Sequence, residues 1–231
     1  MSFDLILSAF PTVLAGLKLT LIITLGSFIL GQVLALPLAL AANGKWRALS
    51  WPANTYIFLV RGSPLLVQLF LIYYGLGTIE AVRHSVLWPL LREPVNCAIL
   101  AIGLNSAAYM AVLVKGALEN MSTGLTEAAR SLGLNRWQTL TRVTLPVLYR
   151  QIIPVMGNEM TIVLKGSSLA STITVMEMTG LARKTVAQTF APFEVFAVAG
   201  AVYLAVGLVS AWVFRRIENR LHVPGLGAAK P

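Results

Sequence analysis

Long apolar runs without a single charged residue restrict the fold of this chain more than any other feature. Residues 19–44 contain 26 residues without a charge, residues 94–114 contain 21, and residues 195–214 contain 20. A helix rises about 1.5 Å per residue and the hydrocarbon core of a bilayer is about 30 Å thick, so each run is long enough to span a membrane. Only 12% of the chain is charged, against about 25% in soluble domains. The chain therefore has the composition of a membrane protein.

Two further runs contain polar residues but are still long enough to cross a membrane. The first, residues 62–79, follows Arg61, and Gly62 and Pro64 at its start permit a local bend. Residues 51–60 are expected to approach it along the membrane interface. The second run, residues 151–173, is unusually polar. The sequence predicts an all-α membrane protein with five transmembrane helices.

The basic residues indicate how these helices are oriented. At the predicted inner ends of the spans and in the tail stand Lys45, Arg47, Arg130, Arg136, Arg142, Arg150, Arg215, Arg216, Arg220 and Lys230, whereas the outer segments hold Arg83, Arg92, Arg183 and Lys184. Cytoplasmic segments carry the excess of Lys and Arg. We therefore expect the N-terminus outside and the C-terminus inside. The net charge of +9 is explained by this pattern and does not indicate nucleic-acid binding.

The run at residues 151–173 carries two charges of opposite sign that cannot pair on a straight helix. Glu159 and Lys165 are six residues apart, which separates them by about 120° at about 100° per residue. Intramembrane charges are costly without a partner. A ligand with both charges, such as an amino acid, would place an ammonium or guanidinium group at Glu159 and a carboxylate at Lys165. In the alternative, Glu159 pairs with another subunit and Lys165 extends outward.

Other polar residues extend this candidate substrate site. Asn105 and Tyr109 are one helical turn apart and project from one face, either toward a substrate cavity or toward a neighbouring helix. The sequence Gly166-Ser167-Ser168 favours a local break in the helix, which would offer backbone and hydroxyl groups. The predicted substrate-binding set is Glu159, Lys165, Asn105, Tyr109, Ser167, Ser168 and Thr161.

Residues 122–146 form a polar segment between two apolar runs and are predicted to fold as two short helices. Ser122 or Thr123 is suited to cap the first helix, and Gly133 to end it in the left-handed conformation. Asn135 and Gln138 match a capping box, and Pro146 is expected to end or kink the helix at that point. An amphipathic hairpin in the membrane interface is one alternative. A DNA-reading helix-turn-helix is disfavoured, because the adjoining spans leave little freedom to enter a groove.

The same segment matches a known signature. Glu127, Ala128, Ala129, Gly133 and the sequence V-T-L-P at residues 143–146 resemble the E-A-A-x3-G-x9-I-x-L-P signature of ABC-importer membrane subunits, with Val143 in place of isoleucine. The resemblance implies a cytoplasmic coupling hairpin that docks into a partner ATPase subunit, with Gly133 at the turn. Its predicted coupling residues are Glu127, Ala128, Ala129, Arg130, Leu132 and Gly133. It also implies that ATP and magnesium are bound by the ATPase subunits and that this chain is not itself an enzyme. The sequence has no G-x4-G-K-[ST] loop.

Further segments extend the resemblance over nearly the whole chain. R-G-S-P-L-L-V-Q-L at residues 61–69, N-S-A-A-Y at 105–109 and the stretch at 158–170 resemble permeases for polar amino acids, especially those of arginine and histidine/lysine/arginine systems. Ser63, Val143 and Gly166 depart from the usual residues. The resemblance implies the type I ABC importer permease fold, with a transmembrane domain at residues 1–220, the coupling hairpin at 122–146 and a flexible cytoplasmic tail at 221–231.

The same resemblance implies a multi-pass protein of the bacterial inner membrane that moves cationic amino acids. Its expected partners are an ABC ATPase dimer, a second permease subunit that is identical or homologous, a periplasmic amino-acid-binding protein, membrane lipid and the amino-acid substrate, with no nucleic acid. The main alternative is an ion-coupled secondary carrier that uses Glu159 and Lys165 as a proton relay. A non-transporting scaffold is another. A metal site has little support, because Cys97 is the only cysteine and the two histidines, His84 and His222, lie far apart.

Overall fold

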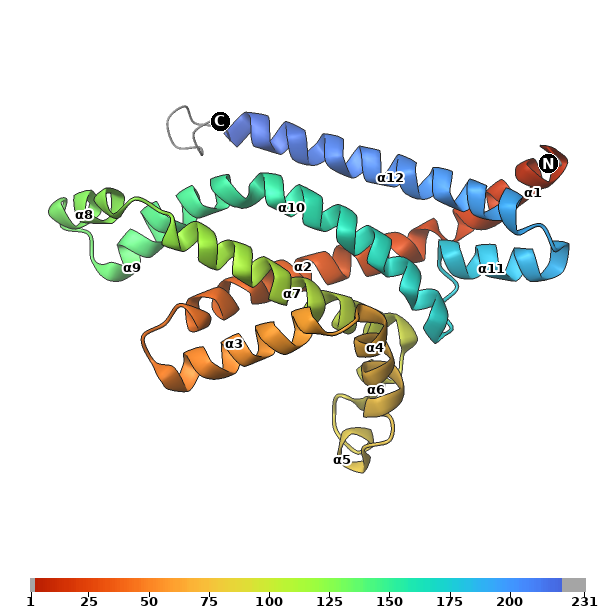
Figure 1. Cartoon of the computed structure of the whole chain (residues 1–231), viewed down its shortest axis with the longest axis horizontal. Coiled ribbons are helices and arrows are strands. Elements are labelled where there is room, and N and C mark those ends of the chain that lie inside the picture. The colour runs from red at the N-terminus through yellow and green to blue at the C-terminus, as the bar shows by residue number, and fades with distance from the viewer. Residues whose placement is uncertain (1–2, 222–231) are drawn as a thin grey trace.

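The computed structural model of the chain describes residues 3–221, and the regular structure within them is helical throughout (Figure 1). Four of the long helices are α2, α7, α10 and α12, and shorter helices connect or flank them. In chain order the elements are α1 Phe3–Ala15, α2 Leu17–Ala42, α3 Arg47–Gly62, α4 Leu65–Phe70, the π-helix η1 Leu71–Gly75, α5 Glu80–Arg83, α6 Trp88–Leu91, α7 Pro94–Glu119, α8 Thr123–Ser131, α9 Arg136–Thr139, the π-helix η2 Leu140–Thr144, α10 Leu145–Ser167, the 3-10 helix η3 Ser168–Ile173, α11 Met178–Thr189 and α12 Pro192–Leu221.

Within the described residues, three helices are long and apolar enough to cross a membrane, namely α2, α7 and α12. A fourth span is possible if α3 and the α4–η1 segment count as one bent helix. The helix α10 covers most of the run at residues 151–173, which was predicted to span the membrane. It is not one of the helices found long and apolar enough, and it contains polar residues such as Arg150 and Glu159. Five spans and the orientation of the termini therefore stay predictions.

The core is built on the close packing of α2 against α7. Small residues on both helices let the backbones approach. A Cβ on Gly31 of α2 would lie 2.7 Å from Ser106 Oγ, and one on Gly103 of α7 would lie 2.8 Å from a Leu30 side-chain carbon. Ala35 and Ala39 continue the same buried face of α2. This pair is the scaffold on which the candidate substrate residues of α7 are held.

The predicted bend near Gly62 and Pro64 is present. The helix α3 ends at Gly62, α4 begins at Leu65, and the two segments meet at 109°. Ser63 and Pro64 between them have extended backbone conformations. Proline disfavours the helical conformation of the preceding residue, which explains why the helix breaks at Ser63.

The path from the hairpin into α10 differs from the prediction at two points. Pro146 does not end a helix: it lies in the first turn of α10, directly after the π-helix η2. At the other end, α10 stays α-helical through Gly166 and Ser167, where a break was expected. It tightens into the 3-10 helix η3 at Ser168, and Thr174 ends η3 with φ 69°.

The arrangement of the elements places the hairpin of α8 and α9 at one end of the molecule (Figure 1). The α2–α3 turn and the C-terminal end of α12 lie toward the same end, whereas α11 lies at the opposite end (Figure 1). The basic residues Lys45, Arg130 and Arg215 belong to these three neighbouring segments. Residue 221 of the predicted tail belongs to α12, and residues 222–231 lie outside the described part.

Candidate functional site

The turn of the α8–α9 hairpin is held by backbone geometry that requires glycine. Gly133 has φ +80°, a conformation that glycine adopts without steric cost. Its N–H donates to Arg130 O at 2.9 Å, and the N–H of Leu134 donates to Ala129 O at 3.1 Å. This pair of bonds is the Schellman motif. The predicted left-handed end of the first helix is thus confirmed.

The start of α9 is capped as predicted, but the start of α8 is not. Gln138 N–H donates to Asn135 Oδ1 at 2.9 Å, and Asn135 N–H donates to Gln138 Oε1 at 3.0 Å, which completes the capping box. Ser122 is the N-cap residue of α8, yet its side chain accepts no capping hydrogen bond. The second helix of the hairpin is therefore the more firmly fixed at its start.

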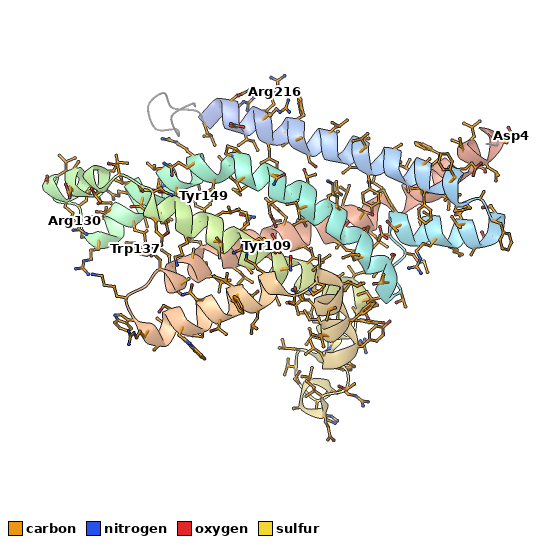
Figure 2. All side chains as sticks on the ribbon, viewed as in Figure 1. Asp4, Tyr109, Arg130, Trp137, Tyr149 and Arg216 are labelled. Carbon is orange, nitrogen blue, oxygen red and sulfur yellow. The ribbon has the colours of Figure 1, made fainter. Side chains whose placement is uncertain are left out.

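The predicted coupling residues present a mixed polar and apolar surface. Glu127, Ala128 and Arg130 are exposed, while Ala129 is buried inside the hairpin. Leu132 is 83% exposed and Trp137 is 71% exposed. Figure 2 shows Arg130 and Trp137 on the hairpin at the end of the molecule. Large apolar side chains exposed beside charged ones are typical of a surface that binds another protein.

Glu159 is a buried carboxylate between α10 and α7. Its side chain is 5% exposed, and Ser106 Oγ donates to Glu159 Oε1 at 2.7 Å. Gly31 of α2 packs against the same serine. Within residues 3–221 no ion pair joins Glu159 to Lys165 or to any other base, in agreement with their predicted angular separation.

Lys165 is exposed in the described part of the chain, and its role at the substrate stays a prediction. It lines a cleft of about 320 Å³ together with Ser168, Thr179, Phe196 and Tyr203. The six residues from Glu159 to Lys165 turn the two side chains to different sides of α10, so burial of one does not imply burial of the other. The cleft combines a cation with three hydroxyl groups and two aromatic rings.

Asn105 and Tyr109 face the bent segment of α3 and α4. Asn105 Nδ2 donates to Gln68 Oε1 at 3.0 Å, and Tyr109 Oη donates to Arg61 O at 3.4 Å. Gln68 in turn donates to Val60 O at 2.7 Å. The prediction that Asn105 and Tyr109 share one face is confirmed, and both find protein partners there.

The remaining hydroxyl groups of the predicted site bond to their own helix. Ser167 Oγ donates to Leu164 O at 2.7 Å, Ser168 Oγ to Lys165 O at 2.7 Å, and Thr161 Oγ1 to Gly157 O at 3.3 Å. Five of the seven predicted residues therefore lie in three surroundings: Glu159 at the buried α7–α10 contact, Lys165 and Ser168 in the cleft beside α11 and α12, and Asn105 and Tyr109 on the face toward α3 and α4. Their role in substrate binding stays a prediction.

Sequence reasoning missed Glu177, which is the most highly bonded acid in the described residues. Its carboxylate caps α11, accepting from Gly180 N–H and Thr179 N–H at 2.9 Å each, and Tyr203 Oη of α12 donates to it at 2.7 Å. Thr20 of α2 donates to it at 3.4 Å. Burial raises the pKa of Glu177 above its ordinary value, and these hydrogen bonds act in the opposite direction. Only the position of an acid before the sequence MTGLA hinted at an N-cap.

Together, the apolar helices and the exposed hairpin define a helical membrane protein with a polar helical hairpin at one end. A solved amino acid ABC transporter, crystallised with histidines, matches the fold with a TM-score of 0.81 and 29% identity, covering 95% of this chain and 99% of that one. The fold is that of a type I ABC permease.

The chain belongs to the family of binding-protein-dependent transport system inner membrane components, whose family model matches residues 31–223. Among curated relatives, the octopine transport system permease protein of Rhizobium meliloti is 46% identical over 209 residues, which cover 90% of this chain and 85% of the relative. The histidine/lysine/arginine/ornithine transport system permease protein of Escherichia coli K12 is 34% identical over 206 residues, which cover 89% of this chain and 87% of the relative.

Proposed function

We propose that this chain is the membrane-spanning permease subunit of an ATP-driven importer for polar, cationic amino acids and their derivatives. It provides the translocation path and couples it to a partner ATPase, in the inner membrane of a bacterium. The observation that carries this proposal is the exposed hairpin with its E-A-A-x3-G sequence in a chain whose relatives are amino-acid permeases. Octopine, histidine, lysine, arginine and ornithine, which appear in the names of those relatives, all contain basic nitrogen groups.

The hairpin is suited to transmit movement. Gly133 and the Asn135 capping box fix the angle between its two helices, and η2 joins α9 to α10 without a flexible loop. A force applied to the exposed Leu132 and Trp137 by the ATPase would therefore be transmitted along α10 to Glu159. In this mechanism, ATP binding brings two hairpins together and switches a pair of permease subunits from inward-facing to outward-facing. A periplasmic binding protein then delivers the substrate.

The candidate substrate residues supply the groups that a cationic amino acid needs. Glu159 offers a carboxylate to an ammonium or guanidinium group, and its single bond from Ser106 leaves the other oxygen without a hydrogen bond from any described residue. Lys165, with Ser168 beside it, offers a cation to a carboxylate. Asn105 and Tyr109 add an amide and a phenol. The low dielectric of such sites strengthens these contacts.

The proposal is tested by reconstituting the chain in liposomes with its ATPase and binding protein. Uptake and ATPase activity are measured for arginine, histidine, lysine and octopine, with glutamate as an anionic control. We expect stimulation by the cationic compounds and its loss in Glu159→Gln, because the neutral amide cannot compensate a cation in a buried site. Glu218→Gln, a half-buried acid near the C-terminal end of α12, is the control and should behave as wild type. Stimulation by glutamate alone would contradict the substrate assignment.

The rival mechanism, an ion-coupled carrier, makes a different prediction in the same liposomes. A carrier would accumulate substrate without ATP and lose uptake when a protonophore removes the proton gradient. The importer would need ATP and would tolerate the protonophore. Uptake that persists without the ATPase subunit would favour the carrier.

A further inference from the structure

Arg61 is a cation near the middle of the fold that has no acidic partner in the described residues. It is exposed, and its guanidinium carbon lies 5.3 Å from the centre of the Tyr109 ring. The sequences of α3, α4 and η1 contain no Asp or Glu, and within residues 3–221 no ion pair joins Arg61 to an acid. The guanidinium of Arg61 instead contacts the electron-rich face of the Tyr109 ring.

Arg61 lies beside the middle of α7, a helix long and apolar enough to span a membrane. Tyr109 lies within one turn of the midpoint of α7, which runs from Pro94 to Glu119, and Figure 2 shows it near the centre of the molecule. Over the 14 residues from Arg47 to Arg61, α3 covers about 21 Å at about 1.5 Å per residue. A charged side chain at the centre of a bilayer is strongly disfavoured against lipid, so this side of α3 must face water or another protein surface.

A cleft opens beside Arg61. It lies between α3 and α7, has a volume of about 420 Å³, and is lined by Arg61, Asn54, Phe58, Val112 and other residues. At its far end, Lys115 Nζ lies 3.9 Å from Glu119 Oε1. Glu119 is ten residues from Tyr109 on α7, about 15 Å away at about 1.5 Å per residue. Glu119 is therefore too distant to neutralise Arg61, and the part of the cleft next to Arg61 is cationic.

We propose that Arg61 binds the carboxylate of the transported amino acid within this cleft, as a station on the half of the path that leads to the coupling hairpin. A guanidinium group is a planar fork that matches a carboxylate with two parallel hydrogen bonds. The guanidinium carbon lies over the face of the Tyr109 ring, a cation–π contact that does not use the N–H groups as hydrogen-bond donors. This inference rests on the proposed function and adds a residue outside the Lys165 cleft.

The cleft also sets the direction of the ligand. Arg61 repels the guanidinium or ammonium group of a cationic cargo, whereas the other end of the cleft, where Lys115 and Glu119 form an ion pair, is close to neutral and repels it less. The geometry therefore orders the cargo with its carboxylate toward the membrane centre and its basic group toward the end of α7. Release at that end, next to the hairpin, completes import if the hairpin is cytoplasmic.

The test compares arginine with agmatine, which is arginine without its carboxylate. The permease complex with its ATPase is purified without nucleotide and without the binding protein, so that the selectivity of that protein does not enter. Displacement of radiolabelled arginine by each compound is measured for wild type, Arg61→Gln, Arg61→Lys and Arg47→Gln. Arg47 is an exposed cation in the first turn of the same helix and serves as the matched control.

We expect wild type to prefer arginine over agmatine by about tenfold or more, as a charge-assisted hydrogen bond allows. Arg61→Gln should reduce the preference for arginine to the part that Lys165 supplies, Arg61→Lys should reduce it less, and Arg47→Gln should leave it unchanged. A full preference in Arg61→Gln would overturn the inference. Dissociation of the permease pair in Arg61→Gln but not in Arg61→Lys would also overturn it, because Arg61 would then pair with an acid of the second subunit.

Two further measurements keep the result interpretable. If Arg61→Gln does not fold, Tyr109→Leu removes the ring that holds the guanidinium and should reduce the arginine preference; an unchanged preference counts against the inference. Stimulation of ATPase activity by delivered arginine in wild type is recorded in parallel. If arginine stimulates the ATPase while the Arg61 variants keep the full preference for arginine over agmatine, only the inference about Arg61 fails. If no cationic amino acid binds or stimulates the ATPase, the proposed function fails as well.

Discussion

Replacing Glu177 by alanine should destabilise the fold more than any other single loss of a polar group described above. Its carboxylate joins three helices: it caps α11 through Thr179 and Gly180, and it accepts the hydroxyl of Tyr203 on α12 and that of Thr20 on α2. The residue is completely buried. Water therefore cannot replace the carboxylate in the variant without opening the packing.

The magnitude has two contributions. Loss of an N-cap side chain costs about 1 kcal/mol. The Tyr203 hydroxyl, on a half-buried side chain and 2.7 Å from the carboxylate, loses its acceptor, and an unsatisfied group that is shielded from water costs about 1–3 kcal/mol. Thr179 Oγ1, 3.1 Å from the same hydroxyl, is an alternative acceptor and limits the second contribution. Together these give about 2–4 kcal/mol of lost unfolding free energy.

The measurement is reversible unfolding of the purified chain in mixed micelles, followed by far-UV circular dichroism. Glu80→Ala is the control, because that side chain is 90% exposed and such changes usually stay within about 0.5 kcal/mol. The double variant with Tyr203→Phe should lose less than the sum of the two single variants, since both remove one interaction. A loss below about 1 kcal/mol for Glu177→Ala, or strict additivity in the double variant, would refute the reasoning.

Three further predictions concern the hairpin and the helix contacts. Glu127→Lys should leave membrane insertion intact but uncouple ATPase activity from uptake, measured side by side in liposomes; unchanged transport would count against the docking role. Gly133→Val places a β-branched residue at φ +80°, should cost about 1–2 kcal/mol locally, and should lower coupled uptake without reducing substrate binding. Gly16→Ala brings a Cβ to 2.5 Å from Met178 N and should lower the thermal midpoint, whereas Gly200→Ala, with open space around it, should not.

The parts of the structure that could be predicted depend on residues close together in sequence. The left-handed turn at Gly133 and the capping box of Asn135 and Gln138 each involve only a short run of neighbouring residues, so local rules suffice. The bend at Ser63 and Pro64 is local in the same sense. Long uncharged runs identified α2, α7 and α12 because a helix in lipid must satisfy its own backbone and present apolar side chains.

The parts that were missed or misjudged depend on contacts between distant segments. Thr20 lies 157 residues from Glu177, and no local pattern announces that pairing. Helical periodicity gave the angle between Glu159 and Lys165 but not the neighbours on each side of α10, so the exposure of Lys165 could not be derived. The π-helices η1 and η2 were likewise not predicted, because no local sequence rule distinguishes them from α-helix.

The exposed cations of a single chain argue that it works as part of a larger assembly. Arg61 and Lys165 are both exposed, and they open into different clefts. Exposure of a charge to lipid at the centre of a helix costs about 2.5–3.5 kcal/mol on insertion scales, whereas large apolar residues such as Val33 and Leu204, at 64% and 63% exposure, are suited to lipid. A second permease subunit should therefore cover the sides that carry Arg61 and Lys165 or enclose water there, and leave the Val33 and Leu204 surfaces to the bilayer. Cysteine crosslinking between two copies or homologues would contradict this arrangement if pairs formed at residues 33 and 204 and none formed near 61 or 165.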